Sequence, residues 1–246
     1  MSEGTKHPTA MLGFRWGEEE RHFECFDNCL SRVTCQAILD GKSYPRFPFV
    51  EDVSVVMDVG ANVGAASVFF SLAYPGATVF SFEPGELPYS LLVRNTEALD
   101  NVRINNFGLY SSDAELPLYR GKYETGMSSV NKSMSTRNES DMITLRSVRD
   151  WLAENSITAV DVLKVDTEGC EIPILGAMSD LLSTVKVIYL EYHNDDDRKE
   201  LDRILGETHL LVHGMMMAHL GEVAYVAKDV VRSGSDLDSR AIRLDL

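Results

Sequence analysis

The fold is decided by the stretch VSVVMDVGANVG, which runs from Val53 to Gly64. Its first seven residues form a largely β-branched, apolar run that is short enough for a strand buried on both faces. A glycine-containing turn follows, and residues 65–73 then have the composition of a helix. Strand, glycine turn and helix in this order open a βαβ unit, so the stretch predicts an α/β protein.

The same alternation of strand and helix continues along the chain. Further strands are expected at 78–82, 102–107, 160–165 and 185–190, helices at 87–99, near 172–182 and at 199–207, and a closing pair of strands at 209–213 and 223–227. This order predicts a mostly parallel, doubly wound sheet with helices on both faces.

Three regions are expected along the chain. They are an N-terminal cap segment at 1–50 with a helix at 26–39, a main domain at 51–230 and a C-terminal tail at 231–246. The interval 111–143, between the third and fourth strands, has no clear periodicity and is interpreted as an insertion, either a lid or a disordered segment. Within it, Gly121 to Asn138, including Met127 and Met134, are expected to cover a ligand.

Composition and charge exclude several classes of partner. The chain has 246 residues, 44% hydrophobic and 25% charged, as in globular proteins. The 23 Lys and Arg against 38 Asp and Glu give a net charge of −15, so no nucleic acid and no membrane partner is expected. No apolar stretch approaches the roughly 20 residues of a membrane helix and no export signal is seen, so a cytoplasmic location is expected. The oligomeric state is left open, a homodimer included.

The four cysteines do not indicate a zinc site or a disulfide framework. They lack the paired C-x-x-C spacing, and buried, reduced thiols are expected at Cys25, Cys29, Cys35 and Cys170.

The turn after the first strand is not one of the common phosphate-binding loops. It matches neither G-x-G-x-x-G nor G-x-x-x-x-G-K-[ST]. Asp58 and Glu83 end the first two strands, where a carboxylate can accept hydrogen bonds from a ribose diol. S-adenosylmethionine has such a ribose, a cationic group and no pyrophosphate. We expect Asp58 to face its ammonium group, Glu83 its ribose, and Gly60, Asn62 and Gly64 its methionine portion. The alternative is a structural turn with acids at ordinary helix starts.

Four blocks of sequence resemble the FkbM-type family of class I S-adenosylmethionine-dependent methyltransferases. They are VVMDVGANVGAASVFFSLAYPGATVFSFEP at 55–84, ITLRSVRDWL at 143–152, DVLKVDTEGCEIPILGAM at 161–178 and VKVIYLEYH at 185–193. The resemblance implies a Rossmann-like fold and O-methylation of a hydroxyl on a small molecule, a natural product or a sugar. It also implies cofactor contacts at Pro84, Gly108 and Leu109. One departure is Arg146, where the family usually has Asp.

Methyl transfer needs an acceptor oxygen held about 3 to 3.5 Å from the methyl carbon, and an alcohol also needs a base or a metal to lose its proton. The candidates follow the fourth and fifth strands: Lys164, Asp166, Glu168, Glu171, Glu191 and His193. Alternation along each strand should bring their side chains to one edge of the sheet. His193 is expected to be the base, because neutral imidazole accepts protons near pH 7. Asp166 is expected to orient the cofactor or the hydroxyl, while Lys164 either pairs with Glu191 or acts in catalysis.

A divalent cation held by Asp166, Glu191 and His193 is a further option, on which the sequence does not decide. The acidic run at 195–197 is interpreted as a helix start. Met215, Met216 and Met217 are expected to fill the core or line a pocket.

Two other functions stay open. An NAD-dependent oxidoreductase is disfavoured by the missing third glycine of the turn. A non-catalytic binding module on the same fold has Arg146 as its only hint.

Overall fold

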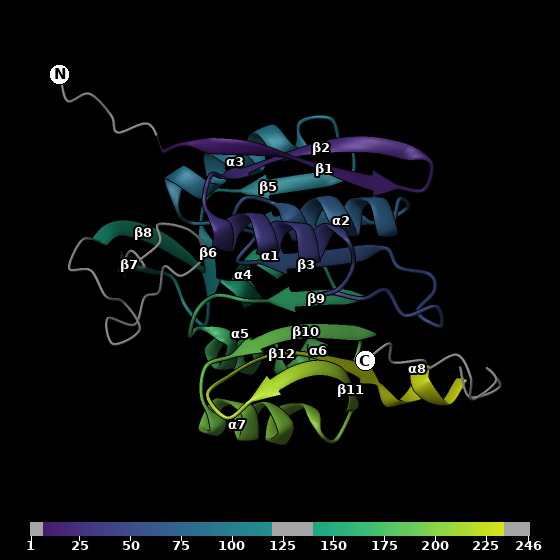
Figure 1. Ribbon diagram of the computed structural model, residues 1–246. Coiled ribbons are helices and arrows are strands. Elements are labelled where there is room, and N and C mark those ends of the chain that lie inside the picture. The colour runs from purple at the N-terminus through teal and green to yellow at the C-terminus, as the bar shows by residue number, and fades with distance from the viewer. Residues whose placement is uncertain (1–6, 120–139, 234–246) are drawn as a thin grey trace.

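The computed structural model describes residues 7–119 and 140–233 and has a seven-stranded sheet at its centre (Figure 1). The strands lie in the order β11-β12-β10-β9-β3-β4-β5. Their bounds are β3 Val55–Val59, β4 Thr78–Phe82, β5 Val102–Asn105, β9 Val162–Val165, β10 Val187–Tyr192, β11 His209–Met217 and β12 Leu220–Ala227. Strands β5, β4, β3, β9 and β10 are parallel, and β12 runs antiparallel between β10 and β11. The predicted parallel sheet and its closing pair are confirmed.

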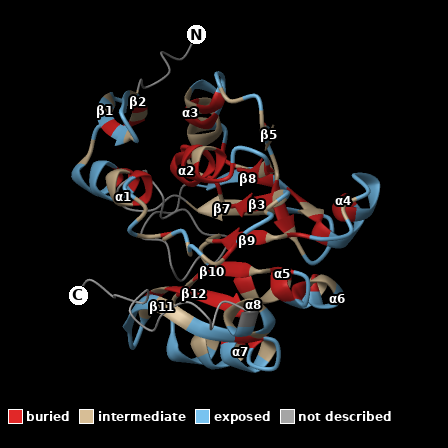
Figure 2. Ribbon diagram, turned by 90° about the vertical axis from the view of Figure 1, so that its right-hand side faces the viewer, coloured by how far each residue is buried: buried red, intermediate tan, exposed pale blue. Residues whose placement is uncertain are grey.

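Helices cover both faces of this sheet, as the view along the strands in Figure 2 shows. On one face, α1 (Cys29–Leu39), α2 (Ala65–Ala73) and α3 (Glu86–Thr96) pack with α8 (Lys228–Ser233) around a core that includes Phe70 and Tyr189. On the other, α4 (Val148–Glu154), α5 (Glu171–Ala177), α6 (Ser179–Leu182) and α7 (Asp195–Leu205) cover a second core. In this second core, the rings of Phe82 and Trp151 pack edge to face, with their centroids 4.7 Å apart. Asn194 caps α7 and its first turn holds Asp195, Asp196 and Asp197, as predicted.

The N-terminal segment contains an antiparallel hairpin that the sequence did not indicate. Its strands are β1 (Thr9–Trp16) and β2 (Glu19–Phe26). Its buried contributions to the first core are Phe14, Phe23, Cys25 and Phe26. Helix α1 begins later than expected, at Cys29, because Asn28 caps it by accepting a hydrogen bond from the Ser31 amide. The segment therefore packs on the sheet through the same core as α2.

A second, three-stranded sheet occupies part of the interval that was expected to be irregular. Its order is β6-β8-β7, with β6 Gly108–Tyr110, β7 Ala114–Tyr119 and β8 Ser140–Ser147. The interpretation of 111–143 as irregular is therefore wrong at both ends, because β7 and β8 pair antiparallel. The expected lid, with Met127 and Met134, lies outside the described residues. Figure 1 shows this small sheet beyond one end of the central strands.

Two expectations about single side chains are corrected. Met215, Met216 and Met217 are exposed, because they lie on the edge strand β11 rather than in the core. Cys29 is exposed at the start of α1, whereas the other three cysteines are buried, and all four are free thiols. No helix in the described ranges is long and apolar enough to cross a membrane.

Candidate active site

The carboxyl ends of β3, β4 and β9 are joined at the glycine turn. The amides of Gly60 and Ala61 both donate to the carbonyl of Phe82, and the Asp166 amide donates to Val59. Gly60 has a φ of +81°, and a Cβ there would lie 1.8 Å from the carbonyl oxygen of Asp166. A side chain at this position is therefore excluded by both backbone conformation and space.

Glu83 binds this turn through one carboxylate oxygen and its own loop through the other. One oxygen accepts from the Asn62 amide and the other from the Gly85 amide, each at 2.8 Å. Asn62 adopts a left-handed conformation with a φ of 50°, which directs its amide to the carboxylate. Burial raises the pKa of Glu83 to about 7, although the two amide hydrogen bonds oppose the shift.

A cavity of about 670 Å³ opens over the turn. The predicted cofactor residues that line it are Gly60, Asn62, Glu83, Pro84, Gly108, Leu109 and Asp166. Phe26 from β2 and Leu118, Met142, Ile143 and Leu145 from the small sheet form its apolar walls. Gly64 is not in the wall. It caps α2 with a φ of +92° and packs against Leu92.

Asp58 lies beneath the turn instead of facing the cavity. Its side chain is fully buried, accepts a hydrogen bond of 2.6 Å from Ser67 and lies 3.1 Å from Lys164 Nζ. The expected contact between Asp58 and a cofactor ammonium is therefore not what this geometry provides. The reason is register: Asp58 and Lys164 are direct partners in the pairing of β3 with β9.

Lys164 also departs from its predicted partner. Its ammonium lies 3.1 Å from Asp58 and 3.7 Å from Asp166, and it donates to the carbonyls of Val59 and Gly60. The predicted pairing with Glu191 is wrong, because these groups surround the ammonium at the end of β3. Burial alone would lower the pKa of Lys164, but Asp58 and Asp166 override it and raise the pKa.

The loop after β9 is shaped by Glu171. Its carboxylate accepts from the amide and the hydroxyl of Thr167 and from the Gly169 amide. These bonds hold Glu168 in a left-handed conformation with a φ of 56°. Glu171 therefore fixes the loop, while Asp166, Thr167 and Glu168 line the cavity.

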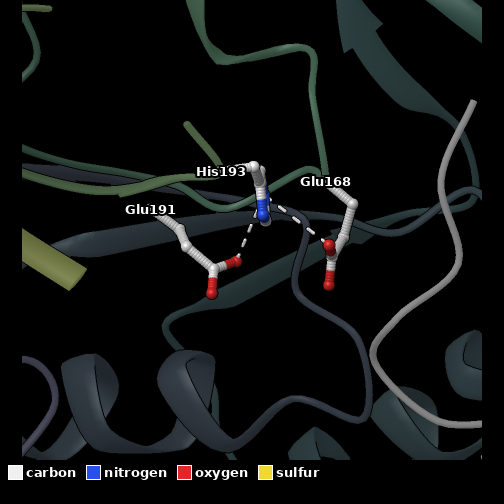
Figure 3. Close-up of side chains that lie close together, drawn as sticks. All are labelled: Glu168, Glu191 and His193. Carbon is white, nitrogen blue, oxygen red and sulfur yellow. Dashed lines mark ion pairs between the residues drawn. The ribbon is translucent and has the colours of Figure 1, made fainter. Parts of the chain in front are cut away.

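Glu168 approaches two residues from the end of β10 (Figure 3). His193 Nε2 lies 3.6 Å from a carboxylate oxygen of Glu168 and 3.6 Å from one of Glu191. Ligand atoms of all three residues lie within 4.8 Å of one another. The predicted convergence of the ends of β9 and β10 is thus present in the structure.

Carboxylates crowd this side of the site. Burial and then the neighbouring Asp166 and Glu171 raise the pKa of Glu168 to about 8. Burial and Asp166 also raise the pKa of Glu191 well above its ordinary value. Burial opposes ionisation of Asp166 too, but the Lys164 ammonium prevails and lowers its pKa. Asp166 is therefore the carboxylate that stays ionised through the neutral range.

Two residues of this site were missed by the sequence analysis. Tyr44, buried in the N-terminal segment, donates a hydrogen bond of 3.2 Å to Asp166. Glu222 on β12 is paired in register with Glu191 on β10. Neither residue belongs to a recognisable sequence motif, because only tertiary packing brings them to the site.

Arg146 does not line the cavity. Its guanidinium forms an ion pair of 2.7 Å with Glu154 and lies over the ring of Phe107. Its neighbour Leu145, on the opposite face of β8, is the one in the cavity wall. The departure from the family pattern at Arg146 is thus accommodated by contacts outside the site.

The fold and cavity define an α/β protein of the Rossmann-like class I methyltransferase type. The family model for the methyltransferase FkbM domain matches residues 58–225. The chain belongs to this FkbM methyltransferase family, which confirms the resemblance noted in the sequence.

Two named methyltransferases are similar to this chain. The chain is 28% identical over 162 residues to the hexuronic acid methyltransferase AglP of Haloferax volcanii, covering 65% of this chain and 64% of that protein. It is 24% identical over 219 residues to the 31-O-demethyl-FK506 methyltransferase FkbM of Streptomyces tacrolimicus, covering 77% of this chain and 80% of that protein. This chain thus spans just under two thirds of the length of the Haloferax relative.

A solved structure supports the fold alone. The fibrillarin pre-rRNA processing protein of Methanococcus jannaschii superposes with a TM-score of 0.50 at 10% identity, covering 89% of this chain and 83% of that one.

The raised pKa of Glu83 predicts a pH-dependent stability. In the unfolded chain Glu83 ionises near 4.5, so between this pH and about 7 the folded chain holds a proton that the unfolded chain lacks. The free energy of unfolding contributed by Glu83 therefore falls as pH rises through this window. Urea unfolding at about pH 5 and about pH 8 should show a smaller loss of stability for Glu83→Gln than for the wild type.

The matched control is Glu97→Gln, which removes an exposed carboxylate at the end of α3. It should keep the wild-type pH dependence. If Glu83→Gln and the wild type lost the same free energy of unfolding between the two pH values, Glu83 would ionise normally in the folded chain.

Proposed function

We propose that this protein is an S-adenosylmethionine-dependent methyltransferase that methylates a hydroxyl group on a small molecule, a sugar or another natural product. The observation that carries the proposal is the cavity over the Gly60 turn, with Glu83 in its wall. Its volume of about 670 Å³ lies within the usual range of ligand sites. The name of one relative, a 31-O-demethyl-FK506 methyltransferase, supports an oxygen acceptor on a natural product. The name of the other, a hexuronic acid methyltransferase, supports a sugar-derived substrate.

The residues around the turn fit the proposed cofactor. Gly60 has no side chain, and a Cβ at this position would clash with the Asp166 carbonyl oxygen. Glu83 uses each oxygen once toward the backbone, so each keeps a lone pair for a ribose hydroxyl. Pro84, Gly108 and Leu109 supply a wall for the adenine. Gly60 and Asn62 face the methionine portion in this assignment.

When bound, S-adenosylmethionine supplies an electrophilic methyl group. The chain's own task is to hold the acceptor oxygen in line and to take up the hydroxyl proton. His193 and Asp166 are proposed to accept the proton and Glu191 to help hold the acceptor oxygen, because the three side chains converge beside the cavity. Lys164 is proposed to act indirectly, since its ammonium is buried and keeps Asp166 ionised.

The N-terminal segment is proposed to cap the acceptor side. Phe26 lines the cavity and Tyr44 reaches Asp166, so the segment contributes both an apolar wall and a hydrogen bond. The division into a cap at 1–50, a domain at 51–230 and a tail at 231–246 stays a prediction. A cytoplasmic location and the lack of nucleic acid partners stay predictions that rest on composition and charge.

The alternative functions are less well supported. The turn has no third glycine for a dinucleotide pyrophosphate. The hint for a non-catalytic module is weakened, because Arg146 is engaged outside the cavity.

The first test is ligand-induced stabilisation. S-adenosylhomocysteine at about 100 times its dissociation constant should raise the free energy of unfolding by about 2.7 kcal/mol, or the melting temperature by roughly 5 °C or more. Glu83→Ala should abolish this shift, and Glu97→Ala should retain it. NAD should give no shift. An unchanged melting curve with S-adenosylhomocysteine and stabilisation by NAD would contradict the proposal.

The second test concerns the proton-accepting group. His193→Ala should lower kcat by about 10² or more, because the hydroxyl proton then lacks its acceptor. Its affinity for S-adenosylhomocysteine, measured by calorimetry, should stay within a few-fold of the wild type, since His193 is not in the cavity wall. His219→Ala, at the exposed turn between β11 and β12, should match the wild type in both. Wild-type turnover in His193→Ala would remove His193 from the mechanism.

A further inference from the structure

We propose that Glu168, Glu191 and His193 form a binding site for a divalent transition-metal cation beside the cofactor cavity. The binding itself follows from the geometry of these side chains, while its use in methyl transfer rests on the proposed function. The set differs from the one suggested by the sequence, because Glu168 replaces Asp166. Asp166 is already engaged by Lys164 and Tyr44.

The spacing of the three side chains suits a shared cation better than direct contact. Each carboxylate oxygen lies 3.6 Å from His193 Nε2, which is too long for a hydrogen bond. Ligands at about 2.0 to 2.2 Å from one cation lie roughly 3 to 3.6 Å from each other. The three ligand atoms also lie within 4.8 Å of one another. The three side chains therefore need to move inward only slightly to coordinate a cation.

The imidazole nitrogen is an independent indication of a ligand. His193 Nε2 is buried and has no hydrogen-bond partner among the described residues. Its side chain is only 11% exposed, so water has little access to it. A buried nitrogen of this kind costs free energy unless something binds it. Figure 3 shows it directed between the two carboxylates.

The charge around the site also favours a cation. Glu191 and Glu222 face each other in register across β10 and β12, an arrangement that is unfavourable for two carboxylates. Asp166 and Glu168 also repel a negative charge on Glu191, and a cation bound between these groups would offset the repulsion. The Lys164 ammonium acts on Glu168, but Asp58 and Asp166 lie 3.1 Å and 3.7 Å from it and share its charge.

The two elements that carry the ligands are fixed by their own bonds. Glu171 holds the loop of Glu168 through Thr167 and Gly169. Glu191 and His193 extend from the end of β10, which pairs on both sides within the sheet. The ligands are thus preorganised by elements that do not depend on the cation.

The donor set indicates which cations fit. Two carboxylates and one imidazole suit Mn²⁺ or Zn²⁺ better than Mg²⁺, which prefers oxygen ligands. Three protein ligands leave coordination positions open, as in catalytic sites. Because Glu168 lines the cavity, an acceptor hydroxyl can take an open position there. Coordination would hold its oxygen and make its proton easier to lose. With His193 Nε2 on the cation, ionised Asp166 would accept this proton in its place.

The test uses Mn²⁺ alone, with neither cofactor nor acceptor. The full chain is stripped with EDTA, exchanged into metal-free buffer and titrated by calorimetry. One Mn²⁺ should bind per chain. Glu168→Gln, Glu191→Gln and His193→Ala should each weaken the binding at least about tenfold. Pulsed EPR of the Mn²⁺-loaded wild type should show coupling to one histidine nitrogen, a readout that needs no variant.

The controls separate this site from other acids. Asp196→Asn removes an exposed carboxylate close by in the chain, and His219→Ala removes an exposed imidazole; both should bind Mn²⁺ as the wild type does. Melting temperatures in EDTA check that each variant folds. No saturable binding up to about 5 mM, or no nitrogen coupling, would overturn the proposal. Either result leaves the S-adenosylhomocysteine test unaffected, so failure of the cation site and failure of the proposed function are distinguishable.

Discussion

The site depends on one buried ammonium group. Lys164 Nζ lies 3.1 Å from Asp58 and donates to the carbonyls at the end of β3, and the two side chains are 3% and 0% exposed. Burying two ions costs several kcal/mol each, and this cost is offset only when the remaining hydrogen-bonding groups are satisfied. Here Ser67 donates to one oxygen of Asp58, and the Lys164 ammonium lies 3.1 Å from the other. The pair thereby holds the end of β9 against the turn after β3.

The other features of the site follow from this connection. With β9 held at the turn, the Asp166 carbonyl lies where only glycine fits at position 60. The same ammonium keeps Asp166 ionised at the cavity wall. Asp166 in turn raises the pKa of Glu168 and Glu191, so the carboxyl groups of the site differ in how readily they ionise. The turn and the proposed chemistry are thus linked through one side chain.

The sequence predicted the central sheet well and its attachments poorly. Strands β3, β4, β9 and β10 are short apolar runs buried on both faces, which gives a strong local signal. The hairpin β1–β2 keeps Met11 exposed and buries Phe14 only against other elements, so its pattern carried no clear period. The small sheet depends on pairing β8 with β6 and β7 across the chain, which no local pattern indicates.

The site was predictable to the same extent. Glu83 and the glycine turn are local features at strand ends, and they line the cavity as expected. The partner of Lys164 depends on the register between β3 and β9, which places Asp58 directly opposite. Tyr44 reaches Asp166 across 122 residues of sequence, beyond any spacing argument. A double-mutant cycle in urea, with Asp58→Asn, Lys164→Met and both together, tests the buried pair most directly. Each single change should cost about 3 to 5 kcal/mol and the double change at least about 1.5 kcal/mol less than their sum, whereas additivity within about 0.5 kcal/mol would contradict the account.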